Sequence, residues 1–321
     1  MRVFYYVKWL PWPFVQGREV CRSRWRLWLL YVGMACLSVS VRSLQAQPLV
    51  PEGEVDLFVG VDLRYRDIYH DKVYQWLINL TPGVKWHIGK QWQMAAQVLI
   101  PVVNDYGERY KKVRVNLATL SKELYMGQQG FLKLSGGWFT QERYGLDAKG
   151  FWIVNSWLGL EAQAGLTGYL SMSGPEWEAS KPQRLTGLVG ADVYLTSWNT
   201  QFRVRGGRFL YEDNGVVGDV MRHFKHSSVG LYGEYSDKGG WNGGFKVVVM
   251  IPPYRRARHR VNFRPASNFR HVYNYGSNSY QNMMYQTDPE ENEREGWFDR
   301  ERLPWGSNTM VPDFQTKGGE R

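Results

Sequence analysis

Apolar and polar residues alternate along most of this 321-residue chain. Between residues 55 and 66, the sequence VDLFVGVDLRYR places valine, leucine and tyrosine at odd positions and all of its charge at even positions. Successive side chains of a β-strand point to opposite faces, so this stretch predicts a strand with one apolar and one charged face. Residues 158–165 and 229–235 alternate in the same way.

About twelve such runs predict an all-β, antiparallel chain. They lie near residues 54–66, 75–89, 91–103, 112–124, 129–141, 143–153, 157–173, 184–196, 200–211, 216–225, 228–236 and 244–252, with a further pair near 260–275. Short turn-like stretches such as NDYG, TSWN and SDKGG separate the runs. No segment has the spacing of an amphipathic helix.

The length of the runs distinguishes two all-β architectures. Strands of soluble proteins have about 5 to 6 residues, whereas a tilted strand needs about 9 to 11 to cross a bilayer. Tryptophans cluster near the ends of the runs, as in the aromatic girdles of membrane barrels; they are Trp76, Trp86, Trp92, Trp138, Trp157, Trp198 and Trp241. We therefore expect an antiparallel transmembrane β-barrel of about 12 strands (range 10–14), with a secreted or periplasmic β-sandwich as the alternative.

Residues 1–46 have the order of a secretory signal peptide. Four arginines precede an apolar run at 27–41, and the small residue Ala46 follows it. The apolar run is shorter than the roughly 20 residues of a transmembrane helix, which is the competing interpretation. We expect cleavage after Ala46 and export to the outer membrane of a Gram-negative cell. Both cysteines, Cys21 and Cys36, lie in the removed segment.

Removal of this segment changes the charge balance. Seven of the 40 Lys and Arg residues and one of the 30 acids lie in residues 1–46, so 33 minus 29 leaves +4 in place of +10. This modest charge and the export signal argue against nucleic acid as a partner. Residues 47–286 form the predicted barrel, and the acidic, polar residues 287–321 are expected to form a flexible C-terminal tail.

Catalytic signatures are missing from the sequence. The six histidines include no HExxH motif, and no serine lies in a GxSxG motif. His223 and His226, three residues apart on a strand, would point to opposite faces. The adjacent acids Glu212 and Asp213 precede Asn214 and Gly215, which indicates a tight turn. We expect no enzyme activity, no catalytic residues, no cofactor-binding or metal-binding residues, and no cofactor.

One charged cluster is a candidate binding site. No acidic residue lies between Asp237 and Asp288, while six arginines fall within sixteen positions; they are Arg255, Arg256, Arg258, Arg260, Arg264 and Arg270. Guanidinium groups bind carboxylate and phosphate bidentately. Three partners fit this chemistry: the phosphates of lipopolysaccharide, an anionic polysaccharide, or the acidic tail of the chain itself. A solvated loop without a specific role is the alternative.

The stretch GGWNGGF at residues 239–245 precedes this cluster. It lacks the lysine and spacing of a phosphate-binding loop, and no helix pattern follows it. We expect its glycines to form a hairpin turn, the next strand to start near Phe245, and Pro252 and Pro253 to end that strand.

Four segments resemble the YjbH-type exopolysaccharide outer-membrane proteins. They are TPGVKWHIGKQWQMAAQVLIPVVNDYG at 81–107, GGRFLYEDNGVVGDVMRHF at 206–224, VGLYGEYS at 229–236 and GGWNGGFKVVVMIPP at 239–253. The resemblance covers about 80–265. It implies an outer-membrane β-barrel associated with assembly or export of an extracellular polysaccharide, and it assigns no catalytic residue.

Two functions follow from these patterns. The first is a non-enzymatic outer-membrane barrel that assists exopolysaccharide or capsule assembly or export. The alternative is a structural or adhesin-like barrel without a transport role, and a lipid hydrolase at the barrel rim is a distant third. The expected partners are outer-membrane lipid and lipopolysaccharide, anionic polysaccharide and other envelope export proteins. Side chains fill much of the interior of a barrel of this size, so an open pore is not predicted from the strand number.

Overall fold

The computed structural model describes residues 53–66, 75–89, 91–126, 130–155, 157–171, 178–224, 226–251, 260–274 and 283–291. The strands are β1 (Val55–Arg66), β2 (Gln75–Gly89), β3 (Trp92–Asn104), β4 (Arg114–Met126), β5 (Gly130–Phe139), β6 (Arg143–Ile153), β7 (Leu158–Ser171), β8 (Glu178–Ala179), β9 (Arg184–Leu195), β10 (Thr200–Arg208), β11 (Asn214–His223), β12 (Ser227–Ser236), β13 (Gly240–Met250), β14 (Val261–Pro265) and β15 (Asn268–Asn274). Two short 3-10 turns lie at Glu108–Tyr110 and Thr196–Trp198. No helix in this part of the chain is long and apolar enough to cross a membrane.

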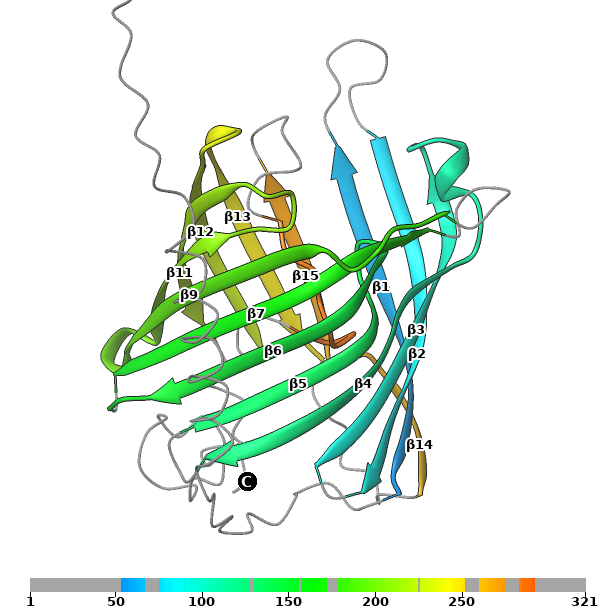
Figure 1. The fold of residues 1–321 in the computed structure, drawn as a ribbon, viewed down its shortest axis with the longest axis horizontal. Helices are drawn as coiled ribbons and strands as arrows, with labels where there is room; N and C mark the ends of the chain where they lie inside the picture. Colours follow the sequence, from blue (N-terminus) through cyan, green and yellow to red (C-terminus); the bar gives the residue numbers. More distant parts are fainter. Residues whose placement is uncertain are drawn as a thin grey trace, which may run out of the picture. The chain divides into compact units, whose positions relative to one another are not determined.

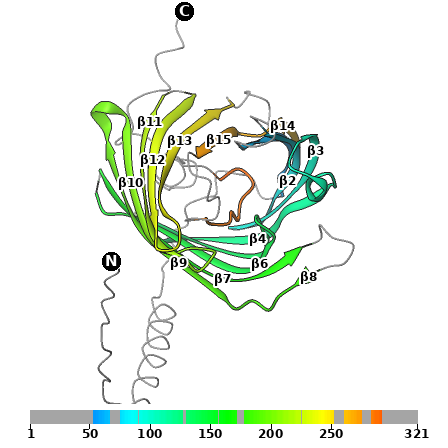
Figure 2. The same ribbon diagram turned by 90° about the horizontal axis from the view of Figure 1, so that it is seen from above.

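All the strands belong to one large sheet. Each long strand from β1 to β13 pairs antiparallel with the next long strand in the chain (Figure 1). The two-residue strand β8 pairs with the end of β7. The prediction of an all-β, antiparallel chain is confirmed, and twelve long strands correspond to the predicted runs. Seen from above, the sheet curves around residues 283–291 (Figure 2).

The two ends of the sheet are consecutive in the sequence. β14 pairs with β1, and β15 pairs with β13. Only Ala266 and Ser267 separate β14 from β15, and each continues the bonding: Ala266 N donates to Val59 O at 2.8 Å, and Ile251 N donates to Ser267 O at 2.9 Å. One stretch of chain therefore bridges the first and last long strands.

The direction of β14 follows from the number of strands. Because twelve long strands alternate in direction, β1 and β13 run oppositely, and a segment antiparallel to β13 must run parallel to β1. β14 accordingly makes a parallel pair with β1, from Val55 opposite Val261 to Val59 opposite Pro265. The path of paired strands begins at β14 and ends at β15. The sheet is therefore curved, but strand pairing does not close it into a ring.

The outer face of the sheet is apolar. Leu146, Leu166 and Leu185 lie opposite one another on β6, β7 and β9, and all three are exposed. Val220 and Leu231 continue the pattern on β11 and β12. In a soluble protein such residues would turn inward, because burial of apolar area is favourable by about 25 cal/mol per Å². The predicted alternation on β1, β7 and β12 is confirmed by this exposure.

Three glycines adopt backbone conformations that other residues avoid. Gly137, Gly145 and Gly207 lie within strands at φ of 134°, 149° and 147°. A Cβ added to each would lie 2.1 to 2.3 Å from a backbone oxygen of the neighbouring strand. Only glycine allows the strands to approach this closely while bending.

The turn predicted within GGWNGGF at residues 239–245 begins earlier than expected. β12 ends at Ser236 and β13 begins at Gly240, so the hairpin uses the predicted turn-like stretch SDKGG, with Gly240 at φ 73°, and the strand expected to start near Phe245 starts five residues earlier. Gly243 and Gly244 instead lie within β13, where a Cβ on Gly244 would meet Tyr273 O on β15 at 1.9 Å. These glycines serve close strand packing.

Candidate functional site

Polar and charged side chains cover the inner face of the sheet. Buried residues there include Asn79, Lys85, Gln93, Thr119, Ser121, Lys133, Asp147, Asp192, Gln201, Arg203, Asp219, His223, Glu234 and Lys246. Moving an ion out of water costs several kcal/mol unless it is paired and hydrogen-bonded. The charged side chains meet this requirement in two networks.

The first network joins β7, β9, β10 and β11. Arg203 Nε donates to Asp192 Oδ1 at 2.8 Å, and it lies 3.9 Å from Glu161 Oε1. Arg205 lies between two acids, 3.6 Å from Glu161 Oε1 and 3.4 Å from Asp219 Oδ2. Asp192 and Glu161 therefore offset the charge of these two interior arginines.

A chain of hydrogen bonds extends this network to β12. Gln201 Nε2 donates to Asp192 Oδ1 at 3.1 Å, and Gln201 Oε1 lies 2.9 Å from His223 Nε2. His223 Nδ1 in turn lies 2.7 Å from Ser228 Oγ. A serine beside a histidine is the arrangement of a nucleophile and its base. Ser228 is 0 % exposed, however, so the contact joins strands within the sheet and presents no hydroxyl to a substrate.

The second network is formed by residues 283–291, which we call the inner segment. It lies inside the curve of the sheet, against strands that are distant from it in the sequence (Figure 2). Its hydrogen bonds with the middle of β4 and with residues just after β5 and β10 include Leu210 N to Met283 O (3.0 Å), Thr140 N to Gln286 O (3.2 Å), Gln286 N to Thr140 Oγ1 (2.7 Å) and Thr119 Oγ1 to Thr287 O (2.9 Å).

Tyr285 anchors one end of the inner segment. Its ring stacks on Phe139 at 5.0 Å between centroids, and its hydroxyl donates to Asp147 Oδ1 at 2.8 Å. Burial and the Asp147 carboxylate raise the pKa of Tyr285, so the phenol stays protonated as a donor. Gly165 makes room for this hydroxyl, because a Cβ there would lie 1.7 Å from it.

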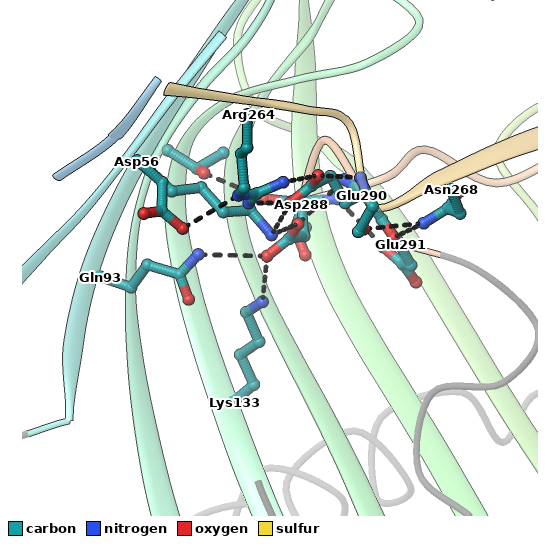
Figure 3. Close-up of polar contacts among 12 residues, drawn as sticks. Asp56, Gln93, Lys133, Arg264, Asn268, Asp288, Glu290 and Glu291 are labelled. Carbon is teal, nitrogen blue, oxygen red and sulfur yellow. Dashed lines mark hydrogen bonds and ion pairs between the residues drawn. The ribbon is translucent and has the colours of Figure 1, made fainter. Parts of the chain in front are cut away.

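Asp288 lies at the centre of the contacts between the inner segment and the inner face of the sheet, which we call the wall. Its carboxylate meets Lys85 Nζ at 2.7 Å, Lys133 Nζ at 3.2 Å and Gln93 Nε2 at 3.3 Å (Figure 3). These three donors come from β2, β3 and β5, so one carboxylate joins β5 to the paired strands β2 and β3, from which β4 separates it. Asp288 is 2 % exposed, and its charge is offset by two buried ammonium groups.

Glu290 is held by two cations and a backbone amide. Arg264 binds its two oxygens at 2.6 and 2.8 Å, Lys85 Nζ lies at 3.0 Å, and Ser267 N donates at 2.7 Å (Figure 3). Burial alone would raise the pKa of Glu290, but the charge of Lys85 and the hydrogen bonds and charge of Arg264 outweigh it and lower the pKa to about 2.

Glu291 completes the acidic group by pairing with Lys149. Burial opposes ionisation here too, but the charge and hydrogen bond of Lys149 lower the pKa of Glu291. Lys149 on β6 lies directly opposite Lys133 on β5. Like charges in such positions are destabilising, so the carboxylates of the inner segment offset a repulsion built into the wall.

The predicted arginine cluster is divided by the structure. Arg264 joins the site described here, where it also contacts Asp56 Oδ2 at 3.1 Å. Arg260 is exposed, with its carbonyl accepting from Val55 N, and Arg270 is exposed on β15. Arg255, Arg256 and Arg258 lie outside the described residues. Of the three partners considered for the cluster, the acidic tail is the one that Arg264 contacts.

The wall lysines were missed by the sequence analysis, although alternation contains a signal for them. Lys85 and Lys133 each stand at a polar position between two apolar residues of a predicted strand, and Lys149 stands between Ala148 and Gly150. The alternation therefore places each lysine on the inner face. It does not place them together, because that depends on the pairing of β5 with β6 and on the curvature that brings β2 near.

Within the described part of the chain, no three His, Cys, Asp or Glu side chains converge as metal ligands would. The chemistry of the site is instead that of cations holding carboxylates. No protein-family model matches the chain, and no curated protein matches it significantly.

Proposed function

We propose that the chain is a non-enzymatic outer-membrane β-barrel that assists assembly or export of an exopolysaccharide, with the inner segment as an interior plug. The observation that carries the membrane part is the inverted distribution of side chains: leucine, valine and aromatic residues are exposed on the outer face, while ions are buried on the inner face. That inversion is typical of membrane barrels.

Closure of the sheet is part of this proposal. In lipid, an unpaired strand edge is costly, because no water satisfies its amides and carbonyls. The stretch containing β14 and β15 is bonded to β1 at its start and to β13 at its end. Tyr65 and Tyr273 span the remaining gap, with 6.0 Å between ring centroids. We infer that this stretch is the closing strand in the membrane.

The polysaccharide role rests on the YjbH-type resemblance and on the interior. Anionic sugar and lipopolysaccharide phosphate are the candidate ligands for Arg255, Arg256, Arg258, Arg260, Arg264 and Arg270, and other envelope export proteins are candidate partners. Arg264 already binds a carboxylate bidentately, which is the contact that an acidic sugar would make.

Deletion of the gene tests the polysaccharide role. We expect a reduced amount or an altered chain length of surface polysaccharide, restored by the wild-type gene. Unchanged amount and length would contradict the export role. The membrane role is tested separately by fractionation and by heat-modifiable migration in detergent gels. Recovery of the protein in the soluble periplasm would overturn it.

A structural barrel without transport is the second candidate, because the inner segment occupies the interior. Conductance in planar bilayers distinguishes the two roles. For the export role, we expect conductance to rise when Asp288, Glu290 and Glu291 are replaced by their amides, since these three carboxylates hold the segment to the wall. A barrel that stays closed in this variant would favour the structural role.

A further inference from the structure

We propose that Lys85, Lys133, Lys149 and Arg264 form a binding site for the carboxylates of an acidic polysaccharide, and that the inner segment occupies it as an internal substitute. This inference rests on the proposed function and names the class of glycan that the barrel would handle. The ligand is a chain of uronic acid sugars, identified by the chemistry of the wall and of its present occupant.

The wall brings four cationic side chains into one group, although their mutual repulsion does not stabilise the sheet. Lys133 and Lys149 are cross-strand partners, and Lys85 reaches the same carboxylate as Lys133. Removing the anion from such a group leaves buried positive charge without a partner, which is strongly unfavourable. A bound anion therefore stabilises this group of cations, as a ligand stabilises its binding site.

The present occupant shows what kind of anion fits. Asp288, Glu290 and Glu291 present three carboxylates from four successive residues of an irregular, non-helical chain. Arg264 grips one of them through two parallel hydrogen bonds, a geometry suited to a planar carboxylate. Repeated carboxylates along a linear polymer are also the defining feature of a polyuronate.

An aromatic ring lies under the start of the inner segment, where Tyr285 precedes Asp288 by three residues. Phe139 stacks on Tyr285 and is buried with Leu210 in the same cluster. Displacing the inner segment would uncover the ring face that Tyr285 covers. Aromatic faces offer a large apolar area to the nonpolar face of a sugar ring. The combination of an aromatic face with carboxylate-binding cations favours a glycan over an acidic peptide.

The first experiment measures binding of oligogalacturonate to the purified full chain in detergent. The triple variant D288N/E290Q/E291Q removes the internal competitor, and it should bind at least about tenfold more tightly than wild type, because a larger fraction of sites is free. Adding Lys133→Gln to this variant should lose that gain. Lys112→Gln in the same background, at an exposed lysine between β3 and β4, is the matched control and should leave binding unchanged.

Three results would overturn the inference: equal binding by the triple variant and wild type, equal binding of a neutral maltooligosaccharide, or equally tight binding of polyglutamate or inorganic polyphosphate. Folding of each variant is checked by heat-modifiable migration. If the triple variant fails to fold, the inference is tested by a second measurement that leaves the three acidic residues in place.

That second measurement uses Gln286→Cys in an otherwise wild-type chain, since both native cysteines precede residue 47. Oligogalacturonate should increase maleimide labelling of this cysteine as the inner segment is displaced, whereas the maltooligosaccharide should not. Labelling that does not respond to oligogalacturonate would sink the inference on its own.

The two proposals fail separately. Normal surface polysaccharide in the deletion strain, with uronate binding intact, would reject the export role. Altered polysaccharide together with absent uronate binding would reject only the carboxylate site.

Discussion

At the scale of single residues, Glu290 illustrates how a buried acid stays charged in this fold. Burial disfavours its carboxylate, but Lys85 and Arg264 favour it more strongly and hold the pKa near 2. The usual value is 4.5. The difference corresponds to on the order of 3 kcal/mol of interaction that exists only when the inner segment is bound.

This depressed pKa predicts that acid weakens the docking of the inner segment. The contribution of Glu290 is fully present above about pH 4.5, and it is lost as the pH falls towards about 2, because the released segment then binds a proton that the docked one does not. We expect amide hydrogen exchange in residues 283–291, corrected for intrinsic rates, to lose protection across this window. Glu290→Gln should be less protected at neutral pH and respond less to acid. Equal protection of wild type at both ends of the window would refute the role of Glu290.

Gly165 offers a way to displace the inner segment without changing charge. Its φ is not in the left-handed region, so alanine is compatible with the strand, but the added Cβ would meet the Tyr285 hydroxyl at 1.7 Å. We expect Gly165→Ala to break the bond from Tyr285 to Asp147 and to raise labelling of a cysteine at position 286. Gly187→Ala on β9, where nothing lies within 4 Å, is the matched control. Similar labelling in both variants would argue against the clash.

At the scale of elements, the hairpin between β5 and β6 turns without glycine. Gln141 and Glu142 both adopt positive φ, of 64° and 55°. Such turns usually contain Asn-Gly or Asp-Gly, which sequence analysis recognises easily. β5 ends at Phe139, so the predicted run at 129–141 extends two residues too far. The pairing of β5 with β6, and with it the meeting of Lys133 and Lys149, depends on this turn.

Strand curvature depends on glycines at particular positions. Gly207 has φ of 147°, and a Cβ there would lie 2.1 Å from Gly187 O on β9. We expect Gly207→Ala to lower the free energy of unfolding by at least about 1–3 kcal/mol, the cost of the strained backbone alone, because the strand spacing must change as well. Gly233→Ala on β12 has open space and should be nearly neutral. Urea unfolding in detergent or lipid measures both, and equal stabilities would contradict this role of Gly207.

The sequence predicts the elements far better than it predicts the site. Period-two alternation identifies twelve strands and the face on which each residue lies, because one side of the sheet is apolar and the other polar. The docking of residues 283–291 leaves no periodic signal, since these residues bind through separate side chains of an irregular segment. Their acidic composition is equally typical of a solvated tail. Only the cations opposite them distinguish a docked segment from such a tail.

At the scale of the whole molecule, the outer face forms an apolar surface that continues from strand to strand. Val220, Leu231, Phe245 and Tyr273 are successive cross-strand partners on β11, β12, β13 and β15. Tyr273 then approaches Tyr65 on β1, so the row extends across the junction between the two ends of the sheet. An apolar row that crosses this junction is what a continuous lipid-facing surface requires.

Leu231 tests this surface directly. It lies in the middle of β12, is 68 % exposed and is flanked by Val220 and Phe245. In a bilayer, an arginine at mid-depth on the lipid face costs about 2–4 kcal/mol, whereas on a water-exposed face it costs almost nothing. We expect Leu231→Arg to reduce folding into lipid vesicles and to lower the amount in the outer membrane, while Leu231→Ala, which adds no charge, has a smaller effect. If the arginine variant folds and fractionates like the alanine variant, the outer face does not contact lipid, and the apolar row must be covered by another protein surface.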